Sequence, residues 1–352
     1  MDNNVYYDGT KLLSLKDMNG NTPEIFIVTS NRSAGKTTYF GRLMINRFLK
    51  NKEKFALIYR FNYELDDVSD KFFKDIGALF FNGYTMRSER KASGIFHNLY
   101  LQKKGSDTEI HCGYALSLNS ADQLKKYSHL FSDVTRMLFD EFQSETNHYC
   151  SDEVRKFISI HTSIARGRGK QVRYVPVYML SNSVSLINPY FVELGISSRL
   201  NNASKYVRGA GWVLEQNYNE TVANRQRESM FNTAFAQNEY VDYSTQNTYL
   251  QDSIAFVETM QGRSKYLGTF RYNGKDFALR QYPERGIIYC DDRPDKSYKY
   301  KISITTEDHN INYIMLKQND VFISNMKFYF NKGCFRFRNL LCKEALLKMI
   351  AY

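Results

Sequence analysis

A short loop between an apolar run and an amphipathic segment carries the residues best suited to hold phosphate. In IFIVTSNRSAGKTTYF, residues 25–40, the loop ends in Gly35-Lys36-Thr37. A strand–loop–helix turn of this kind directs backbone amides and a helix N-terminus at anions. We expect Lys36 to reach the β- and γ-phosphates of ATP and the Thr37 hydroxyl to ligate Mg²⁺. The expected ATP-binding residues are Ser30, Asn31, Arg32, Ser33, Ala34, Gly35, Lys36 and Thr37.

The loop departs from the usual phosphate-loop pattern at one position and adds a cation at another. Ser30 stands where the first glycine is usual, and because serine is small we expect only a modest cost to the turn. Arg32 lies within the loop. It is either a cation beside the phosphates or a solvated arginine that points away from them.

A second motif supplies two carboxylates. The segment MLFDEF, residues 137–142, is an apolar strand end followed by Asp140 and Glu141. Asp140 is expected to hold the Mg²⁺ through water, and Glu141 to polarise the attacking water as general base. An isolated Asp-Glu pair is more often simply solvated. Combined with the upstream loop, the pair predicts a nucleotide-hydrolysing core.

Two further segments carry candidate residues with open alternatives. The strand VRYVPVYML, residues 172–180, runs into Ser181-Asn182-Ser183. Asn182 or Ser181 is a candidate sensor that holds the attacking water or the γ-phosphate, or the segment is a simple turn or helix cap. Before it, RGRGK, residues 166–170, places three cations among glycines. Arg166 or Arg168 could act as an arginine finger in a neighbouring subunit's site. The segment could instead contact DNA phosphates or be a solvated basic turn.

Alternating helices and apolar strands must position these residues. We expect strands at 24–29, 55–60 and 134–142 besides the strand at 172–180, with helices at 37–50, 120–131 and 151–165. Short strands and turns are expected over 78–118. This alternation predicts an α/β fold with a mostly parallel sheet. A glutamate directly after the first carboxylate indicates the P-loop NTPase type with an additional strand between loop and carboxylates (ASCE).

The character of the chain changes after about residue 200. Residues 201–245 are polar, with a helical patch near 219–238, and are expected to be a linker or small lid after a P-loop ATPase domain at 1–200. Residues 246–352 alternate apolar and polar residues over 254–260, 266–282, 286–292 and 298–306, and end in a helix at about 339–350. They predict a β-rich second domain.

Composition indicates a folded protein with a polyanionic partner. The 352 residues are 43% hydrophobic and 24% charged. The net charge of +11 favours a polyanionic partner, and the alternative is that the chain simply carries extra lysine. Five scattered cysteines form no Cys-x-x-Cys pair, which argues against a disulfide framework or structural zinc and for a reducing compartment. The N-terminal residues do not resemble a secretory signal, and no apolar run reaches membrane-spanning length, so no membrane partner is expected.

Taken together, these segments resemble the terminase-like DNA-packaging motor ATPases of small protein-primed tailed bacteriophages. The resemblance rests on the loop with its arginine, on FDEF at 139–142 and above all on LSNSVSLINPYF at 180–191, a segment that generic ATPases lack. IYRFNYELDDVSDKFF at 58–73, RYNGKDF and GIIYCDD also fit the family. About two extra residues precede Asn182, which leaves Arg168 a rival to Arg166.

The resemblance implies a specific biology. It implies a homo-oligomeric, pentameric ring that docks on the portal (connector) protein of a procapsid and drives double-stranded DNA inward with ATP. Some members also bind structural RNA. The protein would act in the host cytoplasm, transiently at the portal vertex, and be absent from the mature virion. Arg32 would be the loop cation and Arg166 the trans-acting finger.

For the second domain, the resemblance implies a vestigial RNase H-like nuclease. Its carboxylates show no obvious metal-binding context, and nuclease activity is not expected. These acidic residues are Asp252, Glu258, Asp276, Asp291 and Asp292.

Two other functions remain open from the sequence. One is another ring-forming DNA translocase or helicase-type ATPase, and the other is a nucleic-acid-binding scaffold with an inactive loop. The presence of Lys36, Thr37, Asp140 and Glu141 together argues against the scaffold.

Overall fold

The computed structural model describes residues 7–351 apart from 147, 168, 170, 197–204, 236–255, 304 and 317–319. The chain divides into two compact units. The first comprises Met1–Ser185 and Asn201–Gln251, and the second comprises Leu186–Leu200 and Asp252–Tyr352. Each unit is described by itself.

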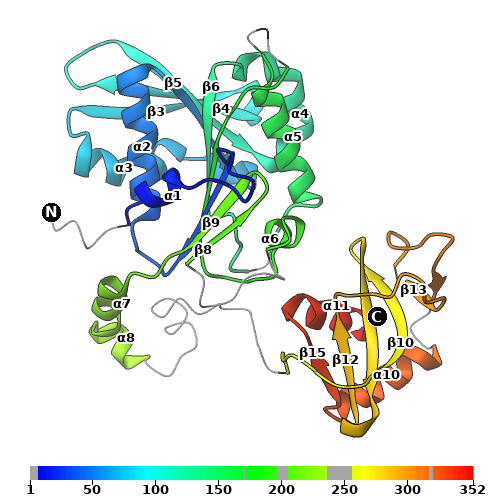
Figure 1. Ribbon diagram of the computed structural model, residues 1–352. Helices are drawn as coiled ribbons and strands as arrows, with labels where there is room; N and C mark the ends of the chain where they lie inside the picture. Colours follow the sequence, from blue (N-terminus) through cyan, green and yellow to red (C-terminus); the bar gives the residue numbers. More distant parts are fainter. Residues whose placement is uncertain are drawn as a thin grey trace. The chain divides into compact units, whose positions relative to one another are not determined.

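The first unit is built on a nine-stranded sheet with a parallel centre (Figure 1). The order is β3-β4-β5-β2-β6-β7-β1-β9-β8, and every neighbouring pair from β5 to β9 is parallel. The central strands are β5 (Glu109–Ser117), β2 (Lys54–Tyr59), β6 (Val134–Asp140), β7 (Val177–Asn182), β1 (Ile25–Ser30) and β9 (Trp212–Gln216). Antiparallel strands close both edges: β3 (Tyr84–Lys91), β4 (Phe96–Lys103) and β8 (Tyr206–Gly209).

Strand β7 lies between β1 and β6, which carry the two predicted motifs. Val28 of β1 aligns with Leu180 of β7, and Asp140 of β6 aligns with the same Leu180. The extra strand expected between the loop and the carboxylates is therefore present. The predicted α/β fold with a mostly parallel sheet is confirmed.

Helices cover both faces of this sheet (Figure 1). Helix α2 (Lys36–Asn51) buries Phe40, Met44, Ile45 and Phe48 at the spacing of one helix face, in a cluster that includes Leu138 of β6. The side chain of the next residue, Phe139, points to the other face, where its ring lies 5.9 Å from that of Phe157 in α5 (Glu153–Ala165). Because successive side chains of a strand point to opposite faces of the sheet, β6 contributes to the apolar core on both faces.

Several elements differ from the sequence expectation. Helix α3 (Val68–Phe80) was not predicted, and residues 78–118 form three full strands in place of short ones. Strand β7 begins at Val177, not at 172. Within 120–131 only α4 (Ala121–Leu124) is α-helical, and Lys125–Phe131 is 3₁₀. Local patterns do not reveal where a strand gains its pairing partner, so such boundaries are decided by the sheet.

The range 201–245, expected as linker or lid, contributes strands to the first sheet. β8 and β9 form a hairpin in which β9 pairs with β1. Helices α7 (Glu220–Arg227) and α8 (Met230–Ala234) follow. The division of the chain into functional domains stays a prediction.

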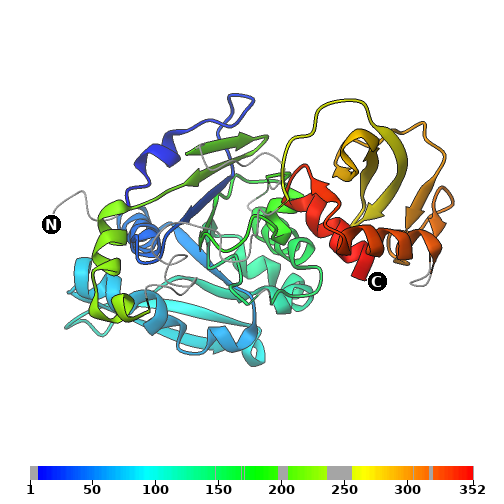
Figure 2. The same ribbon diagram turned by 90° about the horizontal axis from the view of Figure 1, so that it is seen from below.

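The second unit contains a six-stranded mixed sheet in the order β14-β13-β10-β11-β12-β15. β10 (Lys265–Tyr272), β11 (Lys275–Tyr282) and β12 (Ile287–Asp291) are antiparallel, whereas β13 (Lys301–Ser303), β14 (Ile314–Met315) and β15 (Phe335–Phe337) pair in parallel. Helices α10 (Val321–Asn331) and α11 (Leu340–Ala351) lie side by side on one face (Figure 2). The short α6 (Pro189–Glu193) belongs to the same unit.

This arrangement agrees with the β-rich RNase H-like domain that the resemblance implied. The strand expected over 254–260 is an exception in its described part, 256–260, where Val257 forms only an isolated bridge with Phe337. Among the described residues, no helix is long and apolar enough to cross a membrane.

Gly113 of β5 provides a test of the close strand packing. A Cβ atom at this position would overlap with the Phe55 carbonyl oxygen of β2. Because that neighbour is backbone and cannot rotate away, we expect Gly113→Ala to destabilise the first unit by about 1–3 kcal/mol. The measurement is the midpoint of urea or thermal unfolding. Gly83→Ala, at a position with no atom within 4 Å, is the control and should unfold like the wild type; equal midpoints for both variants would contradict this packing.

His161 of α5 provides a test of the contact between α5 and the residues that lie just before β1 and β7. Its Nε2 lies 3.0 Å from the Val175 carbonyl oxygen and 3.5 Å from Glu24 Oε1. Burial opposes the charged imidazole, but the hydrogen bonds to Glu24 and Val175 prevail and raise the pKa of His161. When the pKa of a histidine is higher in the folded state than in the unfolded state, protonation stabilises the folded protein. This contribution is complete at pH below the unfolded-state pKa and is lost as the pH rises through the folded-state pKa.

We therefore expect His161→Gln to lose about 1 kcal/mol of stability near pH 6 and progressively less toward about pH 8.5. Urea unfolding at several pH values measures this difference. His129→Gln, at an exposed histidine, should show no such trend. A stability gap at residue 161 that does not change with pH would refute the assignment.

Candidate active site

The phosphate loop lies between the carboxyl end of β1 and the start of α2. Ser33 and Gly35 adopt left-handed backbone conformations with φ of 58° and 92°. Gly35 is the N-cap of α2, a position at which glycine takes this conformation without strain. Ser30 is fully buried and is not among the described residues with positive φ. The turn therefore has no need of glycine at residue 30.

The Lys36 side chain folds back over this loop. Its Nζ donates to Ser30 Oγ at 2.7 Å, to Asn182 Oδ1 at 3.3 Å and to the Asn31 carbonyl oxygen at 3.4 Å. The residue is only 6% exposed. Burial lowers the pKa of Lys36 to about 8, while the two neighbouring carboxylates oppose this shift. An ammonium held here can form charge-assisted hydrogen bonds with a phosphate group.

Asp140 and Thr37 meet at the carboxyl end of β6. The Glu141 amide donates to Asp140 Oδ1 at 3.0 Å, and hydrogen bonding with the Thr37 side chain favours the charged form of the Asp140 carboxyl group. Burial raises the pKa of Asp140. Carboxylate and hydroxyl oxygens are hard donors of the kind that Mg²⁺ prefers. The donor set therefore fits the magnesium site predicted from the sequence.

Glu141 lines a cavity of about 250 Å³ beside the loop. Its φ of 53° is left-handed, a strained conformation for a residue with a side chain and one that clusters at functional sites. Desolvation, followed by the nearby carboxylates of Asp140 and Glu145, raises the pKa of Glu141. A carboxylate with a raised pKa is better matched to the role of general base.

The predicted Arg32 and Asn182 line the same cavity. Glu145, which the sequence did not single out, lies between them. Asn182 Nδ2 donates to Glu145 Oε1 at 3.4 Å, and Arg32 Nη1 lies 4.0 Å from the same oxygen. The structure thus brings together the loop, the carboxylate pair, the candidate sensor and the loop cation, although the role of each stays a prediction.

Arg166 lies elsewhere in the first unit. It is exposed and immediately follows the last residue of α5, with extended backbone angles. It does not line the cavity that contains Glu141. This position is compatible with an action outside its own site, as expected of a trans-acting finger. Arg168 lies outside the described residues.

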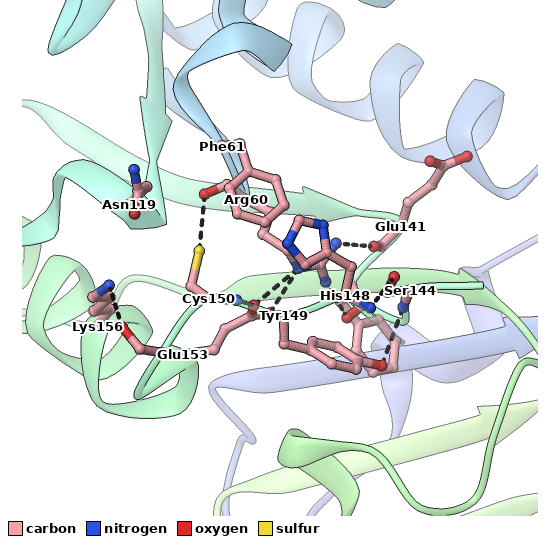
Figure 3. Close-up of polar contacts among 12 residues, drawn as sticks. Arg60, Phe61, Asn119, Glu141, Ser144, His148, Tyr149, Cys150, Glu153 and Lys156 are labelled. Carbon is pink, nitrogen blue, oxygen red and sulfur yellow. Dashed lines mark hydrogen bonds and ion pairs between the residues drawn. The ribbon is translucent and has the colours of Figure 1, made fainter. Parts of the chain in front are cut away.

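Two features of the cavity were not predicted from the sequence. Arg60, directly after β2, forms a buried ion pair with Glu153 at the start of α5 (Figure 3). The ring of Phe61 stacks on those of Tyr63 and His148, at centroid distances of 5.4 Å and 4.7 Å. The sequence held one signal for Arg60, which is a charged residue at the end of the apolar strand FALIYR. In the structure this strand pairs with β6, which carries Asp140.

A phosphate loop after β1, a carboxylate pair after β6 and β7 between them define a P-loop NTPase of the additional-strand type. Comparison with known proteins specifies the family: the chain belongs to the Podovirus DNA encapsidation protein (Gp16) family, whose model matches residues 1–351.

Related proteins match this chain along nearly its whole length and along nearly the whole of their own. A DNA packaging protein of Bacillus phage phi29 is 26% identical over 356 residues, which cover 100% of this chain and 97% of that protein. A DNA packaging protein of Bacillus phage B103 is 28% identical over 334 residues, which cover 92% of this chain and 94% of that protein.

Among solved structures, the bacteriophage phi29 viral genome packaging motor assembly matches with a TM-score of 0.72 at 23% identity, covering 99% of both chains. The Phi-28 gp11 DNA packaging motor matches with a TM-score of 0.58 at 16% identity, covering 99% of this chain and 97% of that one. At these identities the structural matches support the fold.

Proposed function

We propose that this protein is an ATP-driven motor that moves double-stranded viral DNA into a procapsid. The observation that carries the proposal is the convergence of Lys36, Thr37, Asp140 and Glu141 at one sheet edge in a member of a DNA encapsidation family. The net charge of +11 suits a polyanionic substrate. Contacts with DNA phosphates suit a motor that must move any sequence.

The chain's own residues account for ATP hydrolysis. The loop amides from Ser30 to Thr37 and the Lys36 ammonium would bind the phosphates. Glu141 would accept a proton from the attacking water, and Asn182 would hold that water or the γ-phosphate. Arg32, close enough to Glu145 to pair with it, would offset negative charge at the γ-phosphate in cis. Thr37 and Asp140 would hold Mg²⁺, which when bound neutralises charge on the phosphates.

The second unit is proposed to lack nuclease activity. Each acidic candidate that the structure describes there pairs with an arginine. The pairs are Glu258–Arg336, Asp276–Arg271, Asp291–Arg280 and Asp292–Arg338. Asp252 lies outside the described residues. Among the described residues, no group of three or more His, Cys, Asp or Glu side chains is placed to hold a metal ion. Carboxylates already paired with cations are poor candidates for a two-metal site.

The remaining expectations from the resemblance are kept as proposals. They are assembly of a ring, pentameric by family analogy, docking on the portal protein, structural RNA as a further partner, and residence in the host cytoplasm with transient location at the portal vertex. The competing proposal is another ring-forming DNA translocase or helicase. Duplex-stimulated ATP hydrolysis without strand separation favours packaging.

The enzymatic proposal predicts a separation between binding and chemistry. Lys36→Ala should lose ATP binding and hydrolysis because the phosphates lose their buried cation. Glu141→Gln should still bind ATP but hydrolyse it about 10²–10⁴-fold more slowly, because general-base catalysis is lost. Fluorescent-nucleotide binding and phosphate release measure the two effects.

Lys50→Ala, at the exposed last turn of the same helix α2, is the control and should behave like the wild type. Unchanged hydrolysis in Lys36→Ala would instead support a nucleic-acid-binding scaffold with an inactive loop.

The trans-acting role predicts complementation between two defective proteins. Arg166→Ala should bind ATP but fail to stimulate hydrolysis in the neighbouring subunit, a loss of about 10³–10⁵-fold where such a finger operates. Mixed with Glu141→Gln, it should recover hydrolysis, since some interfaces then combine an intact Glu141 with an intact Arg166. Rates across mixing ratios measure this recovery.

Arg155→Ala, at an exposed arginine on the same helix α5, is the control and should be active without mixing. If no ratio of Arg166→Ala to Glu141→Gln restores hydrolysis, Arg166 does not act in trans.

A further inference from the structure

We propose that Arg60 is a positioning residue for ATP hydrolysis, which holds the backbone turn that carries Glu141. The proposal rests on the proposed ATPase function. It assigns to Arg60 and its partner Glu153 a task in the same site, exerted through the backbone that carries Glu141.

The first observation is that Arg60 binds the chain on both sides of the turn. Its Nη2 donates to the Phe142 carbonyl oxygen at 2.7 Å, and its Nη1 makes a longer contact of 3.5 Å with the Glu141 carbonyl oxygen (Figure 3). The guanidinium also lies over the Phe139 ring, 5.8 Å from its centroid. Arg60 thus contacts the last residues of β6 and the start of the loop that follows.

The second observation is that Arg60 is itself fixed from α5. Its Nε donates to Glu153 Oε2 at 2.9 Å and to Oε1 at 3.1 Å, and Glu153 Oε2 also accepts from the Cys150 amide at 2.8 Å. The Arg60 side chain is 7% exposed and that of Glu153 is 1% exposed. The Arg60 carbonyl oxygen accepts in turn from the Cys150 thiol at 3.3 Å and the Asn119 amide at 3.1 Å.

Stability alone is a poor reason for this arrangement. Removing two charges from water costs free energy that an ion pair repays only with good geometry, and apolar replacements of buried pairs are often neutral or stabilising. The Glu141 backbone, in contrast, is left-handed, and a strained conformation persists only where its surroundings determine it. A planar guanidinium that donates in fixed directions is suited to hold both carbonyl groups.

The variant Arg60→Lys distinguishes a role in stability from a role in positioning the turn of Glu141. Lysine still neutralises the buried Glu153 carboxylate, but it lacks the rigid fork that reaches two carbonyl groups and a carboxylate together. We expect Arg60→Lys to keep the wild-type unfolding midpoint, ATP affinity and KM, and to lower kcat by about tenfold or more, because small misplacement of a catalytic group has effects of this size. Steady-state hydrolysis, nucleotide binding and thermal unfolding of the full-length protein measure these quantities.

Arg87→Lys is the matched control. Arg87 also donates to a glutamate through two nitrogens, Nε and Nη2 to Glu109, but it does so on the exposed strand β3. This variant should retain wild-type kcat.

A second variant keeps the test decisive if Arg60→Lys unfolds. Arg60→Met with Glu153→Gln removes both charges at once while the glutamine can still accept from the Cys150 amide, so folding should persist. It should show the same loss of kcat. Single-turnover rates in a Glu141→Gln background add a readout that a purely structural role would not produce. There, Arg60→Lys should cause no further loss, since the group it positions is already absent.

The outcomes distinguish this inference from the proposed function. If the wild-type protein does not hydrolyse ATP, the proposed function itself is wrong. An active wild type with full kcat in a folded Arg60 variant would overturn the positioning role alone. The same holds if the losses from Arg60→Lys and Glu141→Gln simply multiply.

Discussion

Parallel pairing of β1, β7, β6 and β2 is the constraint on which the site depends. Parallel strands bring their carboxyl ends to one edge of a sheet, so residues far apart in sequence become neighbours. Lys36 follows β1, Asn182 ends β7, Asp140 ends β6 and Arg60 follows β2. The contact between Lys36 and Asn182, separated by 146 residues, is a direct product of the β1–β7 register. The apolar strands and the two helix layers stabilise this register. The polar residues at the strand ends can therefore take part in catalysis without being needed for the core.

Helix α5 connects two parts of this arrangement. Its first residue, Glu153, pairs with Arg60 beneath the turn of Glu141, and Arg166 follows its last residue. A 13-residue helix is a rigid connection. Within one subunit, a buried ion pair and one helix therefore connect the turn of Glu141 to the arginine proposed to act in trans.

The sequence was sufficient for the fold class, because Gly35-Lys36-Thr37 and Asp140-Glu141 are local motifs on strongly apolar strands. It was insufficient where residues act through distant partners. Arg60 and Glu153 lie 93 positions apart and carry no motif of their own. Glu145 follows the Asp-Glu pair in an irregular segment, and only the sheet places it beside Asn182 and Arg32. Strands β8 and β9 were missed because their polar surroundings resemble a linker, whereas pairing with β1 determines their structure.

Coupling of ATP hydrolysis at this sheet edge to movement of duplex DNA into a procapsid is the central part of the proposed function. The most direct measurement is the rate of ATP hydrolysis against added duplex DNA, with and without procapsids that carry the matching portal, while nuclease-protected DNA is scored in the same samples. The proposed coupling predicts a hydrolysis rate that rises with duplex DNA, rises further with procapsids, and accompanies protection of DNA. A rate indifferent to duplex DNA, with no DNA protected when procapsids are present, would contradict it.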